Sequence, residues 1–153
     1  RCWQTGMTRA LSGEEAASRI NEAFPGSALQ HNETDVWIRP ESLPAVTRFL
    51  KETQGLDFAF LSAVTAVDYV EHFELIYHLV SMRYNRSMVL KTRCYGREEP
   101  TVPSVVSVWR GADLQEREVW DLMGIRFEGH PNMKRVLLWE GFPGHPLRKD
   151  YLG

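Results

Sequence analysis

The sequence has few cysteines, no long hydrophobic run and almost no net charge, and each of these absences excludes a class of protein. Cys2 and Cys94 are the two cysteines among 153 residues, too few for a disulfide framework or a zinc site, so we expect a reducing compartment. The longest apolar run, residues 58–67, is interrupted by Ser and Thr, whereas a bilayer span needs about 20 apolar residues. A net charge of −2 argues against nucleic-acid binding, which requires a strongly positive surface.

Targeting and catalytic motifs are missing as well. Residues 1–6 precede the first methionine, Met7, and have no apolar core of the kind that a signal peptide carries. We expect residues 1–11 to be an N-terminal extension and the chain to reach a membrane only through a partner. The sequence contains no Gly-rich phosphate loop, Cys-x-x-Cys, Gly-x-Ser-x-Gly or zinc-protease motif. These absences predict that the chain has no self-contained active site.

The first half of the chain contains two amphipathic helices. Ser12 and Glu15 form a capping box, and helical apolar spacing as far as Phe24 predicts the first helix. A second helix is predicted from apolar residues over 43–50, closed by Gly55 in the C′ position.

Strands are predicted between and after these helices. The β-forming residues 34–39 predict one short strand, and the nearly all-apolar residues 58–65 predict an interior strand covered on both faces. Residues 71–81 and 88–95 alternate in polarity and are separated by the turn at 83–86, which predicts an antiparallel hairpin. The expected class is α+β, with two layers: a mostly antiparallel or mixed sheet and helices packed on one face.

A third helix is predicted over residues 114–123, with Asp113 as cap, Glu116 as cap partner and Gly124 as the stop. Before it, Pro103 is expected to open a helical turn. The expected α+β domain therefore covers residues 12–128. Residues 129–153, rich in Gly, Pro, His and Arg, are expected to form an extended tail laid over a surface; we call this segment the tail.

Acidic residues on the third helix allow two interpretations. Glu116, Glu118 and Asp121 could serve as acid and base if their environments separated their pKa values. The structural interpretation makes Arg117 and Asp121 an i,i+4 ion pair and leaves Glu118 solvated. Because the spacing supplies no nucleophile or third group, the residues favour the structural interpretation.

Other polar residues of the C-terminal third give weak signals. His130 and His145 invite a metal site, but each lies in a Gly-His-Pro tripeptide, which is more typical of a turn. Basic residues gather in the tail and suit phosphates, an acidic protein surface, or no ligand: Lys134, Arg135, Arg148 and Lys149. The acidic overall balance favours a protein surface over nucleic acid.

The segment from Trp109 to Leu138 resembles a known family, the C subunit of NADH:quinone oxidoreductase (respiratory complex I, NDH-1), also called the complex I 30 kDa subunit family. Its pattern is Glu-Arg-Glu, an acid three residues later, a histidine and then a basic position, matched here by Glu116, Arg117, Glu118, Asp121, His130 and Lys134. Residues 141–151 also resemble the C-terminal segment of that family, which includes His145, Arg148, Lys149, Asp150 and Tyr151.

This resemblance implies a non-catalytic peripheral-arm subunit of a proton-translocating NADH:quinone oxidoreductase (a translocase). It implies no cofactor in this chain, since FMN, iron–sulfur clusters and quinone are bound by partner subunits. The expected partners are the quinone-site large subunit (the D subunit), along which the tail lies, and neighbouring iron–sulfur subunits. The implied location is the cytoplasmic side of the bacterial cell membrane. An alternative is the equivalent subunit of a complex with another donor: ferredoxin, F420H2 or a membrane-bound hydrogenase.

Overall fold

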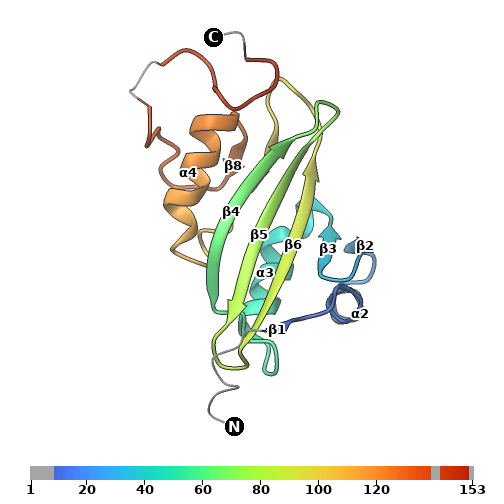
Figure 1. Cartoon of the computed structure of the whole chain (residues 1–153). Coiled ribbons are helices and arrows are strands. Elements are labelled where there is room, and N and C mark those ends of the chain that lie inside the picture. Colours follow the sequence, from blue (N-terminus) through green and yellow to red (C-terminus); the bar gives the residue numbers. More distant parts are fainter. Residues whose placement is uncertain (1–8, 139–141, 152–153) are drawn as a thin grey trace.

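The computed structural model describes residues 9–138 and 142–151 (Figure 1). Within these residues, six strands form one mixed sheet in the order β2-β3-β6-β5-β4, and β1 also pairs with β6. The strands are β1 (Arg9–Ala10), β2 (Ala28–His31), β3 (Asp35–Ile38), β4 (Phe60–Asp68), β5 (Phe73–Ser81) and β6 (Arg86–Cys94). Strand β5 is antiparallel to both β4 and β6, and β3 runs parallel to β6.

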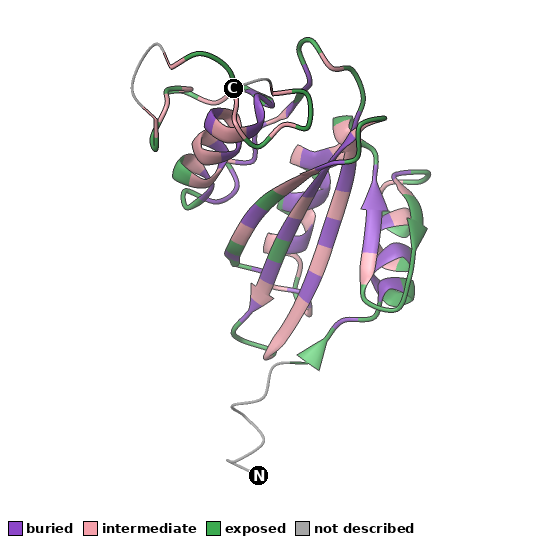
Figure 2. Ribbon diagram, turned by 45° about the horizontal axis from the view of Figure 1, so that its top comes forward, coloured by how far each residue is buried: buried purple, intermediate pink, exposed green. Residues whose placement is uncertain are grey.

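The predicted hairpin and mixed sheet are confirmed. Strands β5 and β6 pair in a continuous antiparallel register from Phe73↔Cys94 to Ser81↔Arg86. The core face of β5 carries Phe73, Leu75, Tyr77 and Leu79, all fully buried. Buried and less buried residues alternate along β6 and along β5 from Leu75 onward (Figure 2), as expected when one face of a sheet meets the core.

The prediction for the strand after the second helix was wrong in position and environment. Strand β4 spans Phe60–Asp68 rather than residues 58–65, and it lies at the edge of the sheet instead of inside it. Small residues fill much of this segment, so its apolar character did not require cover on both faces. The side-chain oxygen of Gln115 accepts the outward backbone N–H of Val64 at 2.5 Å, which protects part of this open edge.

Three helices, α2 (Gly13–Ala23), α3 (Leu43–Glu52) and α4 (Ala112–Met123), pack with the sheet around one core. Ser12 caps α2 as predicted, since its Oγ accepts the N–H of Glu15 at 3.1 Å. A 3-10 turn, η1 (Pro40–Ser42), leads into α3. The predicted C′ role of Gly55 was wrong: α3 ends at Glu52 with Thr53 as its C-cap, and Gly55 lies in the following turn.

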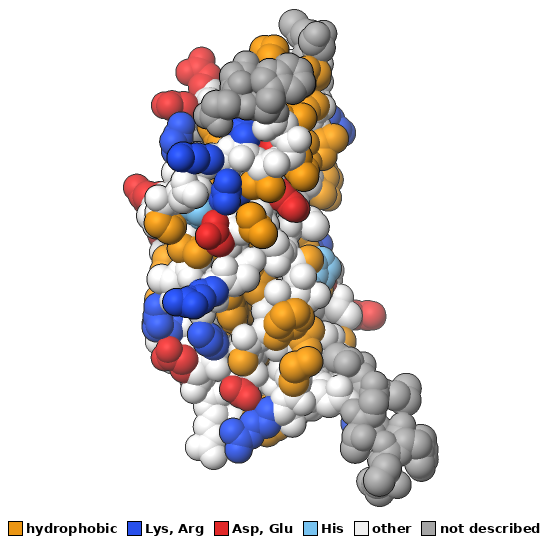
Figure 3. Space-filling model, turned by 90° about the vertical axis from the view of Figure 1, so that its left-hand side faces the viewer, with side chains coloured by type: hydrophobic (Ala, Val, Ile, Leu, Met, Phe, Trp, Pro, Cys, Tyr) orange, Lys and Arg blue, Asp and Glu red, His pale blue; other side chains and the backbone are white. Residues whose placement is uncertain are grey.

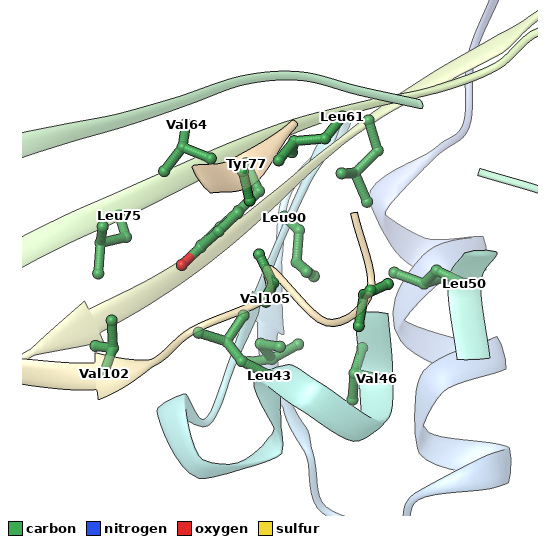
Figure 4. Packing of buried hydrophobic residues seen from close by; sticks show 14 of the residues in the cluster. Leu43, Val46, Leu50, Leu61, Val64, Leu75, Tyr77, Leu90, Val102 and Val105 are labelled. Carbon is green, nitrogen blue, oxygen red and sulfur yellow. The ribbon is translucent and has the colours of Figure 1, made fainter. Parts of the chain in front are cut away.

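The core lies between the helices and one face of the sheet, and Figure 4 shows its centre. Leu43, Val46 and Leu50 of α3 point toward Tyr77 of β5 and Leu90 of β6, and all five are fully buried. The opposite face of the sheet carries polar and charged side chains among apolar ones, and there Glu74 accepts the indole N–H of Trp37 at 2.8 Å. This arrangement confirms the two-layer α+β class.

Two short strands in the second half of the chain escaped prediction, as did β1 and β2. Strands β7 (Thr101–Pro103) and β8 (Arg126–Glu128) pair in parallel on either side of α4. Pro103 was predicted to open a helical turn but is the last residue of β7, and the turn follows, with the N–H of Trp109 donating to the carbonyl of Val105 at 2.9 Å. The tail begins directly after this β7–α4–β8 unit.

We expect Gly13→Ala to destabilise the fold. A Cβ at position 13 would lie 2.1 Å from the carbonyl oxygen of Asn32 and 2.5 Å from that of Asp35, so the backbone entering β3 must move, at a cost of about 1–3 kcal/mol. Gly111→Ala is the matched control, because a Cβ there meets nothing within 4 Å. Denaturant unfolding of both variants checks this, and equal unfolding midpoints would contradict it.

Candidate functional site

The C-terminal tail returns over α4 and the neighbouring end of the sheet (Figure 1). Its described residues, 129–138 and 142–151, form no helix or strand. They are nevertheless fastened to the domain by hydrogen bonds at several points. Three acids of the domain determine the geometry of this site: Asp121 and Glu116 of α4, and Asp68 at the end of β4.

Asp121 holds the first half of the tail. Its carboxylate is fully buried and accepts the backbone N–H groups of Val136, Leu137 and Leu138 at 3.2, 2.7 and 2.9 Å. The guanidinium of Arg135 lies 2.9 Å from its other oxygen. Burial opposes ionisation, but the three N–H groups and Arg135 outweigh it and lower the pKa of Asp121. A buried anion is therefore surrounded by donors from one short stretch of tail.

The predicted Arg117–Asp121 ion pair was wrong. Arg117 donates instead to the carbonyl oxygens of Lys134 at 3.0 Å and Arg135 at 3.5 Å. The tail supplies both the donors that Asp121 needs and the acceptors that Arg117 needs. The two side chains therefore bind the tail and not one another. Helical spacing alone could not reveal this competition.

Glu116 also differs from its predicted role as cap partner of Asp113. Helix α4 begins at Ala112 with Gly111 as N-cap, so Asp113 lies inside the helix. The buried carboxylate of Glu116 accepts the hydroxyl of Ser104 at 2.6 Å and the N–H of Val105 at 2.8 Å. Burial raises the pKa of Glu116, although these hydrogen bonds partly oppose the rise. Glu116 thus fastens the segment after β7 to α4.

Of the remaining motif residues on and near α4, Glu118 is half-buried and Lys134 is exposed. Gly124 adopts a left-handed conformation at φ 76° and ends the helix as predicted. A Cβ at Gly124 would also meet the His145 ring at 2.7 Å, so the tail approaches α4 closely there.

Both tail histidines are engaged with the backbone of α4. The Nδ1 of His130 accepts the N–H of Asn132 at 2.9 Å, which places its ring hydrogen on Nε2, 3.1 Å from the carbonyl oxygen of Asp113. The Nδ1 of His145 lies 3.0 Å from the carbonyl oxygen of Asp121. Within residues 9–138 and 142–151, no group of three or more His, Cys, Asp and Glu side chains is arranged to hold a metal ion.

Asp68 holds the second half of the tail. Its carboxylate accepts two hydrogen bonds from Arg97, at 2.6 and 2.9 Å, and the backbone N–H of Lys149 at 2.8 Å. Arg97 also pairs with Asp150 at 2.9 Å, and Arg148 donates to the carbonyl oxygen of Arg97. The hydrogen bonds from Arg97 lower the pKa of Asp68 despite its burial.

Sequence reasoning missed Asp68 and Arg97. Asp68 lies 81 residues before Lys149 in the chain, and no local pattern links them. Of the predicted tail residues, Lys149 is exposed and Tyr151 is half-buried. Tyr151 packs on Gly144, where a Cβ would lie 2.9 Å from its ring. Arg148, Lys149 and Asp150 thus come together at the Asp68 anchor, whereas Tyr151 lies against Gly144.

Comparisons with known proteins give consistent results. The family model described as "Respiratory-chain NADH dehydrogenase, 30 Kd subunit" matches residues 36–153. The NADH-quinone oxidoreductase C subunit numbered 2 in Rhizobium meliloti (strain 1021) is 47% identical over 117 residues, which cover 74% of this chain and 63% of that relative. The C subunit of the same enzyme from Roseiflexus sp. (strain RS-1) is 40% identical over 148 residues, which cover 92% of this chain and 84% of the relative. The chain thus matches less than two thirds of the length of the Rhizobium protein.

A solved structure shares the fold. One chain in the structure of the membrane-bound sulfane sulfur reductase, an archaeal respiratory membrane complex, superposes with a TM-score of 0.71 at 28% sequence identity. The match covers 90% of this chain and 84% of that chain.

We expect Asp121→Asn and Glu116→Gln to differ in their effect on stability. An amide at position 121 cannot accept from three N–H groups and Arg135 together, so the change should cost about 2–3 kcal/mol. The amide of the Glu116→Gln variant can still accept from Val105 and donate to Ser104, and this variant loses a carboxylate that burial disfavours at neutral pH. Urea unfolding at pH 7 checks both variants. If the Glu116→Gln protein were as unstable as the Asp121→Asn protein, the proposed difference between the two carboxylates would be wrong.

Acid should release the tail. The lowered pKa values of Asp68 and Asp121 mean that their stabilisation is fully present above the unfolded value of 3.8 and is lost as pH falls through the folded-state values. Pepsin digestion from about pH 4 to pH 2 should therefore cut residues 129–151 progressively earlier than the sheet. A tail that is cut equally fast throughout that pH range would contradict both anchors.

Proposed function

Because the chain belongs to the family of the respiratory-chain NADH dehydrogenase 30 kDa subunit, we propose that it is a hydrophilic, non-catalytic subunit of a proton-translocating NADH:quinone oxidoreductase. Its role is to assemble and stabilise the peripheral arm that passes electrons from NADH, through FMN and iron–sulfur centres, to quinone. Partner subunits hold those cofactors. The family match over residues 36–153 is the observation that carries this proposal.

The geometry of α4 supports a structural rather than a catalytic role. Glu116 and Asp121 are both fully buried, and their oxygens accept hydrogen bonds from the chain's own backbone and side chains. A general acid or base must reach the proton that it transfers. In this structure, these two carboxylates reach other segments of the same chain.

The tail is the segment that we propose to lie along the quinone-site large subunit, with iron–sulfur subunits as further neighbours. The backbone of its described residues is hydrogen-bonded to the domain at several points, while several of their side chains face outward. Val136, Leu137 and Leu147 are 38%, 57% and 60% exposed, and Lys134 and Lys149 are exposed as well. An apolar surface with positive charges at its margin suits an acidic protein surface.

Location at the membrane is part of the same proposal. As a member of that complex, the chain lies on the cytoplasmic side of the bacterial membrane and is attached through its partner subunits. Over the residues that the structure describes, no helix has the length and apolar character needed to cross a bilayer.

A related complex with another electron donor is the second candidate. The structural match to a chain of an archaeal respiratory membrane complex, the sulfane sulfur reductase, favours it specifically. Ferredoxin, F420H2 or a hydrogenase module would then replace the NADH module, while the role of this chain in assembly would be the same.

Affinity purification of the tagged chain from gently solubilised membranes tests the proposal. Co-purification of iron–sulfur subunits and a quinone-site large subunit, with FMN and NADH-dependent quinone reduction, is the expected result. A different donor module in the eluate would support the second candidate. Recovery of the chain alone from the soluble fraction would overturn both.

Charge reversal at Lys134 and Lys149 together should lower recovery of the large subunit by about tenfold, because charges at the margin of an interface assist association. Arg83→Glu is the control, since Arg83 is also exposed but lies in the turn between β5 and β6. Quantitative mass spectrometry of the eluates gives the measurement. An equal loss with the control variant would mean that the tail has no special part in docking.

A further inference from the structure

A groove separate from the tail opens where the end of α3, the start of β4 and the residues before α4 meet. Its volume is about 320 Å³, and it is lined by Lys51, Ala59, Phe60, Leu61, Trp109, Arg110 and Gly111. Leu61 and Trp109 are buried and form its floor. Figure 3 looks onto the side of the molecule that carries α4 and the β4 edge, and on the lower half of that face it shows hydrophobic side chains beside Lys and Arg side chains, with Asp and Glu side chains among them.

The floor and one wall of the groove are fixed by hydrogen bonds. The indole N–H of Trp109 donates to the carbonyl oxygen of Phe58 at 3.1 Å. Lys51 donates to the carbonyl oxygen of Val108 at 2.6 Å, which holds its ammonium at the rim. A ligand would therefore meet a preformed surface, which lowers the entropy cost of binding.

The charges at the groove have one sign. Lys51 and Arg110 line it, and no Asp or Glu is among its lining residues. Arg110 is exposed, and within the described part of the chain its guanidinium has no hydrogen-bond or ion-pair partner. The whole chain carries a net charge of −2, so this positive groove is a local feature and not an average property of the surface.

Apolar area lies beside these charges. Phe60 lines the groove together with Lys51 and Arg110, and 51% of its surface is exposed. An arginine and an exposed aromatic ring that line one groove with a buried apolar floor have the composition of a protein-binding hot spot. The outward N–H of Val64 is already bonded to Gln115, so the adjoining edge of β4 is not free to add a strand at that position, and side chains must provide recognition.

We propose that this groove binds an acidic, apolar segment of a neighbouring protein subunit, with an apolar side chain against Phe60 and Trp109 and a carboxylate at Arg110 and Lys51. The inference rests on the proposed function, because it assumes that the chain resides in a multi-subunit complex. It adds a second contact surface on a different part of the domain from the two tail anchors.

Photo-crosslinking in the assembled complex provides the test. A benzoylphenylalanine at position 60 of the tagged full-length chain should crosslink to a segment of another subunit that contains Asp or Glu beside apolar residues. The same probe at Met82, which is 79% exposed in the turn between β5 and β6, is the control and should not reach that segment. Peptide mapping by mass spectrometry identifies the product.

Charge variants provide the second measurement. Arg110→Glu should reduce the crosslink yield from position 60 by about fivefold or more, and Arg110→Lys should retain most of it, because the carboxylate still finds a cation. A crosslink to a second copy of this chain, or to a segment without acidic residues, would overturn the inference. So would the absence of a crosslink from a complex that still contains its iron–sulfur subunits. If those subunits fail to co-purify at all, it is the proposed function that has failed.

Discussion

One buried carboxylate arranges the C-terminal part of this protein. Asp121 accepts three consecutive backbone N–H groups, from Val136, Leu137 and Leu138, and it also pairs with Arg135. A buried charge in that position would be costly without such donors, and the N–H groups of residues 136–138 would lack acceptors without the carboxylate. The carboxylate and this stretch of backbone therefore stabilise each other. Because the backbone N–H groups of Val136 and Leu137 point inward to Asp121, their side chains point outward.

The same principle recurs at two other acids, with different electrostatic results. Asp68 binds a guanidinium and a tail N–H group, and its pKa is lowered. Glu116 is held by a hydroxyl and one N–H in the core, and its pKa is raised because burial outweighs these bonds. Asp121 and Asp68 each bind described residues of the tail, which connects these residues to the α+β domain, whereas Glu116 connects α4 to the segment after β7. This makes the exposed side chains of the tail a preformed surface.

Local signals predicted the elements that local forces specify. The Ser12 cap, the glycine stop at Gly124 and the alternation of β5 and β6 each depend on residues within a few positions of one another. The placement of β4 failed, because a run of small apolar residues is compatible with both an edge and an interior strand. Strands β7 and β8 are three residues each, which is too short for an alternation of apolar and polar residues to be recognised.

By itself, the sequence determined the α+β class, the three helices, the central hairpin and, through its motif from Glu116 to Lys134, the family. It also singled out Glu116, Arg117 and Asp121, whereas no local pattern pointed to Asp68 or Arg97. Only the tertiary structure decided their partners: Asp121 with the tail instead of Arg117, Glu116 with the segment after β7, and Asp68 with Arg97 and Lys149. The reason is physical, because helical spacing determines which side chains are neighbours on one helix. Which of several available donors a buried carboxylate takes depends on the segments that folding brings to it.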